Sequence, residues 1–200
     1  MCGRFYVEAD DIEIQSILRE ITDRDHKRNE PEIKTGEVFP TDNSLVLIKE
    51  RVTVMQWGFQ GIEGKGKIIN ARSETAADKP TFRSHLHAHR CLIPAIFYYE
   101  WLTAGKQKTR HIMRNENGDT LFMAGLYRME NAKAAPVYVI LTRSAAPQIA
   151  HIHNRMPLIL GKDAQAEWLS DHMDFENILH RAFTRIEGIP QADAQLSMDI

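Results

Sequence analysis

The stretch at residues 90–101, RCLIPAIFYYEW, combines apolar, β-branched and aromatic residues with one carboxylate, Glu100, near its end. This composition is typical of a buried β-strand. Burying a carboxylate there is costly unless it is paired, and burial raises its pKa, which suits a general acid or base. An outward-pointing Glu100 at a strand end agrees equally well with this segment alone. Cys91 lies between apolar neighbours and is interpreted as core packing.

Shorter strand patterns surround this stretch, at residues 45–48, 52–57, 138–141 and 158–160. The dipeptide Asn117-Gly118 suits a type I′ turn and predicts a hairpin that joins residues 111–113 to residues 121–123.

Helices are predicted mainly towards the two ends of the chain. Asp10 and Asp11 precede spaced apolar residues at positions 12–21, a pattern typical of a capped amphipathic helix. Further helices are expected after Asp163 and around residues 175–183. Strands in the centre and helices at the ends predict an α+β fold around a sheet or distorted barrel.

The composition is ordinary for a folded soluble protein, with 200 residues of which 43% are hydrophobic and 26% charged. No repeat or linker divides the sequence, so residues 1–200 are expected to form a single domain. The sequence contains neither a membrane-spanning stretch nor a secretory signal, which favours a cytoplasmic protein. Cys2 and Cys91 are therefore expected to be free thiols.

The net charge of −2 hides a marked asymmetry. Residues 60–115 contain ten Lys and Arg against four Asp and Glu, whereas residues 161–200 contain three against eight. The middle of the chain is thus a candidate surface for a polyanion, although uneven charge is more often only a solvated surface.

Two polar motifs could carry chemistry. In residues 69–75, INARSET, an extended backbone would place Asn70 and Arg72 on one side, where one orients a reacting group and the other holds a phosphate. An edge strand that caps the next helix explains the same residues. In residues 151–157, HIHNRMP, His153 and Arg155 could present an imidazole and a guanidinium from one loop, although a structural histidine pair is the commoner case.

Two further features are best explained structurally. His85, His87 and His89 alternate as in some metal sites, but no cysteine or carboxylate set accompanies them, so a solvated helix or turn is preferred and no metal is predicted. Trp57 could stack on a nucleobase if exposed, yet a tryptophan after alternating apolar residues is more often in the core.

The order of six motifs along the chain resembles that of the SRAP family, the SOS response-associated peptidases. These motifs are Cys2-Gly3-Arg4-Phe5, Trp57-Gly58-Phe59, NARSET at residues 70–75, RCLIPA at residues 90–95, Tyr99-Glu100-Trp101 and HNRMP at residues 153–157. The resemblance implies one SRAP domain with a mixed, barrel-like β-sheet and flanking helices. It also implies covalent trapping of abasic sites in single-stranded DNA, without a cofactor.

Residue by residue, the resemblance assigns a role to four catalytic positions. Cys2 would be the crosslinking nucleophile, Asn70 would position it, and Glu100 with His153 would form an acid/base pair. The resemblance implies a further group of DNA-binding residues: Arg4, Pro40, Trp57, Arg72 and Arg155. Of these, Arg72 and Arg155 would contact phosphates, while Pro40 and Trp57 would pack against bases beside the lesion. The expected protein is a monomer that joins the nucleoid when it binds DNA.

This chain departs from the family pattern at two places. The family usually has a Gly-Phe-Tyr-Glu-Trp run, whereas residues 97–101 read FYYEW, so Phe97 replaces the glycine. After Trp57-Gly58 the family commonly continues with a proline and a second tryptophan, whereas residues 60–64 read QGIEG.

The implied chemistry requires Cys2 at the amino terminus after removal of Met1. Its α-amine, with a pKa near ~8, would add to the aldehyde of an abasic site, and its thiol, with a pKa near ~8.5, would close a thiazolidine ring. Elimination from the same Schiff base would give a weak lyase activity.

Two alternatives remain open at this point. Cys2 could act as the nucleophile of a peptidase that cleaves after Met1 or at another peptide bond. The chain could also be a non-enzymatic single-stranded nucleic-acid-binding module with a structural Cys2.

Overall fold

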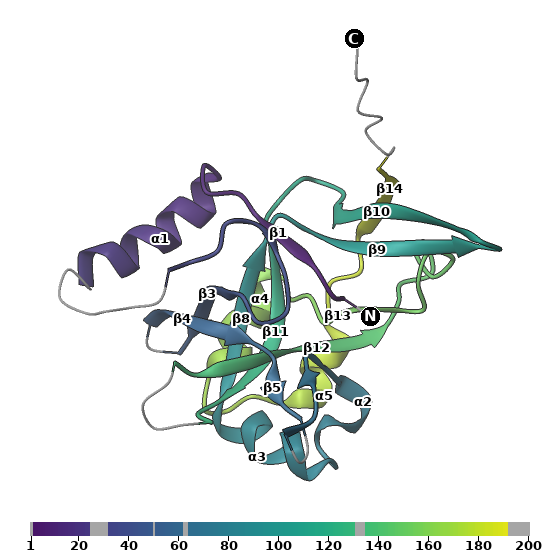
Figure 1. Cartoon of the computed structure of the whole chain (residues 1–200). Coiled ribbons are helices and arrows are strands. Elements are labelled where there is room, and N and C mark those ends of the chain that lie inside the picture. Colours follow the sequence, from purple (N-terminus) through teal and green to yellow (C-terminus); the bar gives the residue numbers. More distant parts are fainter. Residues whose placement is uncertain (1, 25–31, 50, 62–63, 131–134, 192–200) are drawn as a thin grey trace.

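The computed structural model describes residues 2–24, 32–49, 51–61, 64–130 and 135–191. Its central feature is a ring of five strands (Figure 1). β11 pairs with β8, β8 with β3, β3 with β4, β4 with β12, and β12 closes the ring by pairing with β11. The ring strands are β3 (Asn43–Ile48), β4 (Arg51–Trp57), β8 (Arg90–Ala95), β11 (Leu121–Arg128) and β12 (Val137–Ser144). Because only the β4–β12 pair is parallel among these five, the barrel-like mixed sheet is confirmed.

A second, antiparallel sheet of five strands lies against the barrel, in the order β14-β10-β9-β1-β2 (Figure 1). Its strands are β1 (Phe5–Val7), β2 (Gly36–Val38), β9 (Phe97–Ala104), β10 (Gln107–Asn115) and β14 (Ile186–Pro190). The first strand of the chain is therefore in the interior of a sheet, with Phe5 opposite both Val38 and Tyr98.

Short strands extend the barrel on one side. β7 (Asn70–Arg72) pairs with β12 in parallel, and β13 (Arg155–Pro157) pairs with β12 in antiparallel orientation. A separate small hairpin is formed by β5 (Phe59–Gln60) and β6 (Lys67–Ile68).

The helices flank the sheets, and α1 begins as its sequence predicts. α1 (Ile12–Arg24) starts after Asp11, whose Oδ1 accepts hydrogen bonds from the backbone N–H groups of Glu13 and Ile14, each at 3.0 Å. The other helices are α2 (Ser73–Ala76), α3 (Pro80–Ala88), α4 (Lys162–Leu169) and α5 (Phe175–His180). The α+β class is confirmed, as are the helices expected after Asp10-Asp11, after Asp163 and around residues 175–183.

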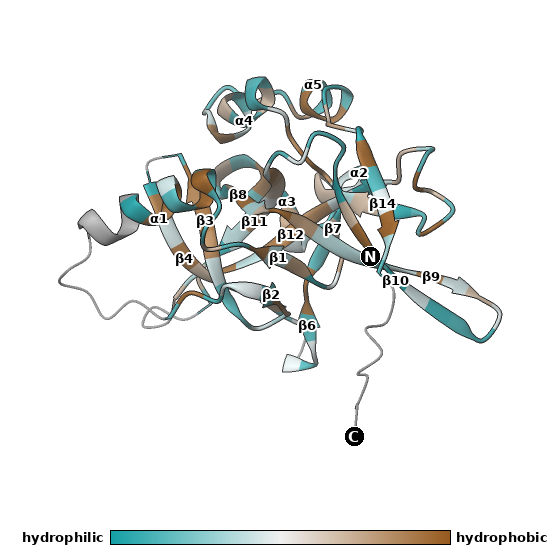
Figure 2. Cartoon of the chain, turned by 90° about the horizontal axis from the view of Figure 1, so that it is seen from above, coloured by the Kyte–Doolittle hydropathy of each residue, from teal (hydrophilic) through white to brown (hydrophobic). Residues whose placement is uncertain are grey.

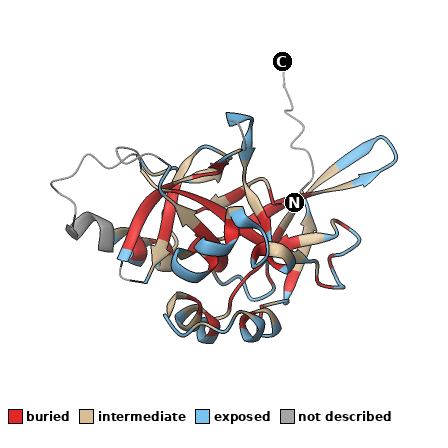
Figure 3. Ribbon diagram, turned by 90° about the horizontal axis from the view of Figure 1, so that it is seen from below, coloured by how far each residue is buried: buried red, intermediate tan, exposed pale blue. Residues whose placement is uncertain are grey.

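The core fills the barrel and the space between the two sheets (Figure 3). β12 carries six consecutive buried residues, as expected for a strand that is covered on both faces. Apolar segments coincide with these interior strands, whereas the tip of the β9–β10 hairpin is hydrophilic and exposed (Figure 2).

Two predictions of local structure are wrong. Asn117-Gly118 does form a turn, with Gly118 at a φ of 78° and its N–H donating to the Asn115 carbonyl at 2.9 Å, but the flanking strands do not pair. β10 pairs instead with β9 and β14, while β11 pairs with β8 and β12. The turn residues determine only that the chain reverses direction. Both edges of β10 pair with β9 and β14, and both edges of β11 pair with β8 and β12, so these two strands have no free edges for each other. The strand expected at residues 158–160 lies earlier, as β13, and Ile159 and Leu160 form only isolated bridges.

Arg90 joins two helices to the barrel. Its guanidinium donates to the carbonyl oxygens of Leu86 and His87 at the end of α3, and to those of Trp168 and Ser170 at the end of α4. The last carbonyl groups of a helix have no partner within the helix, so one side chain here satisfies both ends.

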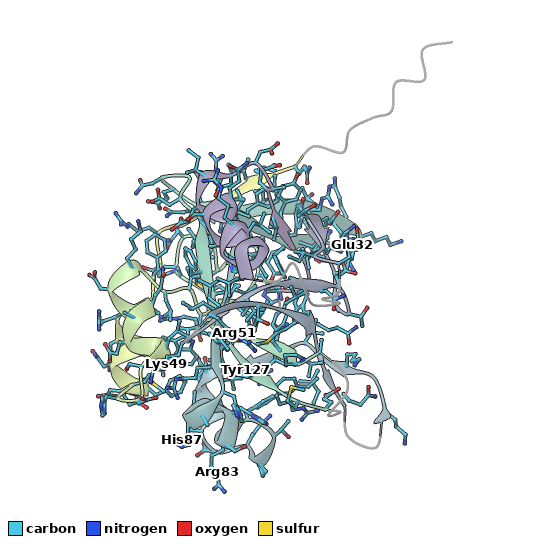
Figure 4. The ribbon with its side chains drawn as sticks, turned by 90° about the vertical axis from the view of Figure 1, so that its left-hand side faces the viewer. Glu32, Lys49, Arg51, Arg83, His87 and Tyr127 are labelled. Carbon is cyan, nitrogen blue, oxygen red and sulfur yellow. The ribbon has the colours of Figure 1, made fainter. Side chains whose placement is uncertain are left out.

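We expect Arg90→Met to lower the free energy of unfolding by about 3 kcal/mol, because charged hydrogen bonds are lost and partly buried carbonyls stay unpaired. In a domain of this size, that corresponds to a decrease in Tm of roughly 6–12 °C. Thermal unfolding followed by circular dichroism measures it. Arg83→Met is the matched control, since Arg83 is exposed on α3 and projects from the surface (Figure 4), and its Tm should stay near that of the wild type.

Candidate active site

The four residues expected to carry catalysis come together at the amino terminus. The side-chain amide of Asn70, on β7, donates to the backbone carbonyl of Cys2 at 2.8 Å. Glu100, on β9, is close enough to Cys2 for its negative charge to raise the pKa of the thiol. His153, in the loop before β13, places Nδ1 at 4.0 Å from Oε1 of Glu100. Three segments far apart in the sequence thus surround Cys2.

Strand pairing explains how this arrangement forms. The backbone N–H of Tyr99 donates to the Arg4 carbonyl at 3.0 Å, which fixes the residues before β1 against β9. Glu100 follows at an inward-facing position of β9 and is 3% exposed. The pairing of β7 and β13 with β12 brings Asn70 and His153 to the same end of the barrel.

Burial dominates the electrostatics of the site. Cys2 is 0% exposed, and this desolvation, followed by the charge of Glu100, raises the pKa of its thiol far above the ordinary value. Burial also raises the pKa of Glu100, and the nearby His153 opposes that shift. The site therefore favours a neutral thiol and makes Glu100 a weaker acid than usual, whereas the sequence suggested a thiol with an ordinary pKa.

His153 forms the boundary between this buried pair and solvent. Its side chain is 29% exposed, and Nδ1 accepts a hydrogen bond from the backbone N–H of Arg155 at 3.0 Å. This contact fixes the ring orientation beside Glu100. The imidazole thus lies between the buried carboxyl of Glu100 and solvent.

Arg155 is already paired within the protein. Its Nη1 and Nη2 atoms contact Oε1 and Oε2 of Glu74 at 2.6 and 2.8 Å, and Nη2 also donates to the Thr142 carbonyl at 2.7 Å. The same interaction lowers the pKa of Glu74. Sequence reasoning noted Glu74 but did not pair it with Arg155, because 81 residues separate the two.

Arg4 lies within an aromatic cluster next to the site, which we call the aromatic platform: Arg4, Phe39 and Trp101. The Arg4 guanidinium lies over the rings of Phe39 and Trp101, with centroid distances of 4.6 and 5.2 Å, and contacts Glu37 at 3.2 Å. Phe39 is 38% exposed, so part of this apolar cluster is open to solvent. Sequence reasoning missed Phe39, whose only signal is its place directly before Pro40.

A strained loop holds this phenylalanine outward. Asp42 accepts a hydrogen bond from the Phe39 N–H at 2.9 Å, and the β-branched Thr41 has a φ of 78°. Such a conformation is disfavoured for a β-branched residue and persists only where the surroundings enforce it. Pro40 is half-buried in this loop, beside the platform, and Arg72 is exposed at the end of β7.

Trp57 does not fit the role of a base-packing residue. It is 0% exposed, its Nε1 donates to the Ile69 carbonyl at 2.9 Å, and its ring contacts Phe5 and Tyr138. Trp57 is a core residue because β4 closes the barrel with its inner face covered. The alternative interpretation of Trp57, as a residue of the core, is therefore correct.

The basic middle of the chain does not form one surface. Arg90 caps helices, Arg110 contacts Glu37, Arg114 contacts Glu187 of the acidic tail, and Arg83 projects on the face seen in Figure 4. Opposite charges from the two segments thus partly neutralise each other in the fold.

The histidines of α3 and its end contact each other and aromatic rings. His85 and His89 approach to 3.1 Å between their Nδ1 atoms, and His85 packs against Phe59. Across the described residues, no group of three or more metal-ligating side chains converges. Within the same part of the chain, no helix has the length and apolar character needed to cross a membrane.

Comparison with known proteins identifies the family. The family described as SOS response associated peptidase (SRAP) matches residues 1–192. This chain belongs to the SRAP family. The abasic site processing protein YoaM of Bacillus subtilis is 36% identical over 186 residues, covering 85% of this chain and 79% of YoaM. The abasic site processing protein YedK of Escherichia coli is 30% identical over 177 residues, covering 84% of this chain and 79% of YedK.

Solved structures share the fold of this SRAP protein. A crystal structure of a Bacteroides thetaiotaomicron protein superposes with a TM-score of 0.78 at 18% identity, covering 96% of this chain and 93% of that one. A protein from Bordetella bronchiseptica gives a TM-score of 0.73 at 21% identity, covering 96% and 100%.

The buried Glu100 gives a prediction on stability. A carboxyl whose pKa is raised by folding destabilises the native state as pH rises above its unfolded value of about 4.3, because the ionised form is disfavoured. Glu100→Gln should therefore raise Tm at pH 8, by a few degrees, and this gain should shrink towards pH 4. Thermal unfolding of both proteins across this range measures it. Glu74→Gln removes a carboxylate whose pKa is lowered by folding, so it should lower Tm at pH 8, and this loss should shrink as the pH falls.

Proposed function

We propose that this protein binds single-stranded DNA at an abasic site and links to it covalently through Cys2. The observation that carries the proposal is the convergence of Asn70, Glu100 and His153 on Cys2, a residue that becomes the amino terminus when Met1 is removed. The names of the relatives, abasic site processing proteins, support DNA with such lesions as the partner. Met1 itself lies outside the described residues.

The first steps are carried by the amine. The α-amine of Cys2 adds to the aldehyde carbon of the opened sugar, and loss of water gives an iminium ion. Asn70 holds the Cys2 carbonyl, so the amine on the same residue has a fixed direction. Glu100, with its raised pKa, donates the proton needed to expel water and then takes one from the thiol. His153 exchanges that proton with solvent.

The last step is ring closure. The sulfur of Cys2 attacks the iminium carbon, the electron pair of the C=N bond moves to nitrogen, and a five-membered thiazolidine results. Only a residue with an amine and a thiol on adjacent carbons can form this ring at one carbon. Closure removes the imine, so it competes with elimination and keeps lyase activity weak.

DNA contacts would lie around the partly exposed His153. Arg72 is exposed and available for a phosphate, and the aromatic platform offers a face for a base, with Pro40 beside it. Arg155 would bind phosphate only by exchanging Glu74 for it. In a duplex the lesion would be covered, so single strands are the expected partner.

A second candidate is removal of Met1 by the cluster itself, which the proximity of Glu100 to the Cys2 thiol favours. A non-enzymatic DNA-binding module is the third possibility, and it predicts equal binding of intact and abasic strands without any adduct. Both alternatives are resolved by the experiment on Cys2.

Cys2→Ala should abolish the heat-stable adduct with an abasic single-stranded oligonucleotide, because no thiol remains to close the ring. Denaturing electrophoresis after incubation measures the adduct, and binding to an intact strand should change less than about twofold. Cys91→Ala is the control, since Cys91 is buried against β11 and away from the reaction. An undiminished adduct from Cys2→Ala would overturn the proposal. Intact masses of wild type and Glu100→Gln, measured first, show whether Met1 is absent and whether its removal needs Glu100.

Phe39→Ala should weaken binding of a short single-stranded oligonucleotide by about tenfold, since loss of one stacked base costs on the order of 1–3 kcal/mol. Fluorescence anisotropy at fixed salt measures this. Met129→Ala, which removes another exposed apolar side chain, 56% exposed, should leave the affinity unchanged. Equal affinities for all three proteins would exclude the aromatic platform as a DNA contact.

A further inference from the structure

Tyr98 carries a buried hydroxyl that the proposed chemistry has not used. It lies two residues before Glu100 on β9, so both side chains are on the inner face of the same strand, and it is 0% exposed. Its hydroxyl has no hydrogen-bond partner within the part of the chain that the structure describes. Tyr138, equally buried on β12, differs because its hydroxyl bonds with Oγ of Ser44 at 2.7 Å.

An unpaired hydroxyl in the core needs a reason. Leaving a buried polar group unsatisfied costs roughly 1–3 kcal/mol, and phenylalanine would fill the same space without this cost. Buried polar groups that lack a partner are candidates for a role in function.

The surroundings of the hydroxyl identify what it faces. Phe5 lies opposite Tyr98 in the β1–β9 ladder, and the Tyr99 N–H donates to the Arg4 carbonyl, so the chain before β1 brings Cys2 to the part of β9 that carries Tyr98 and Glu100. Burial raises the pKa of Tyr98, and the charges of Cys2 and Glu100 raise it further, which favours the protonated phenol. The titratable groups around Cys2 are Glu100 and Tyr98 on β9, Tyr138 on β12 and, beyond Glu100, His153. Among them, Tyr98 is a neutral donor for which the described residues supply no acceptor.

The thiol of Cys2 lacks a good partner once it ionises. At rest its Sγ donates a weak hydrogen bond to the Arg4 carbonyl at 3.8 Å. A thiolate cannot donate, and it would face both this carbonyl and the carboxyl of Glu100. A donor is therefore required for the charged sulfur, which burial otherwise disfavours.

We propose that Tyr98 donates its hydroxyl hydrogen to the Cys2 sulfur as the thiolate forms, and so assists closure of the ring. This inference rests on the proposed function. In the step, the thiol proton passes to the carboxylate of Glu100, the sulfur forms a bond to the iminium carbon, and the C=N electron pair neutralises nitrogen. Tyr98 keeps its proton throughout, and no oxidant or reductant is involved.

The effects of Tyr98→Phe on the amine and on the thiol of Cys2 can be measured separately. Borohydride traps the Schiff base, which needs only the amine, whereas the heat-stable adduct formed without borohydride needs the thiol. With an abasic oligonucleotide in single turnover, we expect heat-stable adduct formation to slow by about 10- to 100-fold, the loss of one hydrogen bond to a charged group. The rate of Schiff-base trapping should stay within about twofold, and the pH profile of adduct formation should move to higher pH.

Tyr138→Phe is the matched control, because it removes the same atom from a hydroxyl that is already paired. It should leave both rates and the pH profile unchanged but lower Tm, whereas Tyr98→Phe should keep or raise Tm. Equal slowing of trapping and closure by Tyr98→Phe, or no change in either, would overturn the inference.

A further measurement distinguishes failure of this inference from failure of the proposed function. In a Cys91→Ala background with Met1 removed, iodoacetamide alkylation of Cys2 reports thiolate formation without DNA, and Tyr98→Phe should move its midpoint to higher pH. If the wild type forms neither trapped nor heat-stable product, the proposed function fails while this midpoint still tests Tyr98. An unchanged midpoint contradicts the role of Tyr98 even if the wild type forms the adduct.

Discussion

The position of β1 between β2 and β9 is the constraint on which the candidate site depends. First strands often lie at a sheet edge, but here Phe5 pairs on both sides, with Val38 and with Tyr98. This pairing places the residues before β1 against the inner face of β9, where Glu100 is buried. A change that loosened β1 would therefore move Cys2 away from Glu100 and His153 without altering any of these three residues.

The buried polar groups of the candidate site lower the stability of the fold. A carboxyl with a raised pKa, a thiol kept neutral by burial and a phenol that finds no partner among the described residues lie in this part of the core. The folded protein would be more stable with an apolar residue at each of these positions. Together the three groups would hold and transfer protons in an environment that contains little water. The closed barrel and the Arg90 contacts supply the stability that such a cluster requires.

Long-range pairing explains where sequence reasoning failed. Asn117-Gly118 correctly indicated a turn, yet β10 and β11 belong to different sheets, because a turn does not determine which strand edges are free. The motif around Arg155 suggested a guanidinium that is available to bind phosphate. In the fold, Glu74 from another part of the chain forms an ion pair with it. The role of Trp57 depended on whether its face of β4 was covered, which the closure of the barrel decided.

The sequence by itself determined the α+β class, the helix start after Asp11, the presence of a helix that includes Asp163, and the identity of Cys2, Asn70, Glu100 and His153 as candidates, because capping, periodicity and motifs are read from the sequence directly. Only the tertiary structure decided that these four residues meet, that the Cys2 thiol is buried beside Glu100, and that Phe39 is exposed while Trp57 is not. Burial and proximity depend on which strands pair across the whole chain, and no local pattern contains that information.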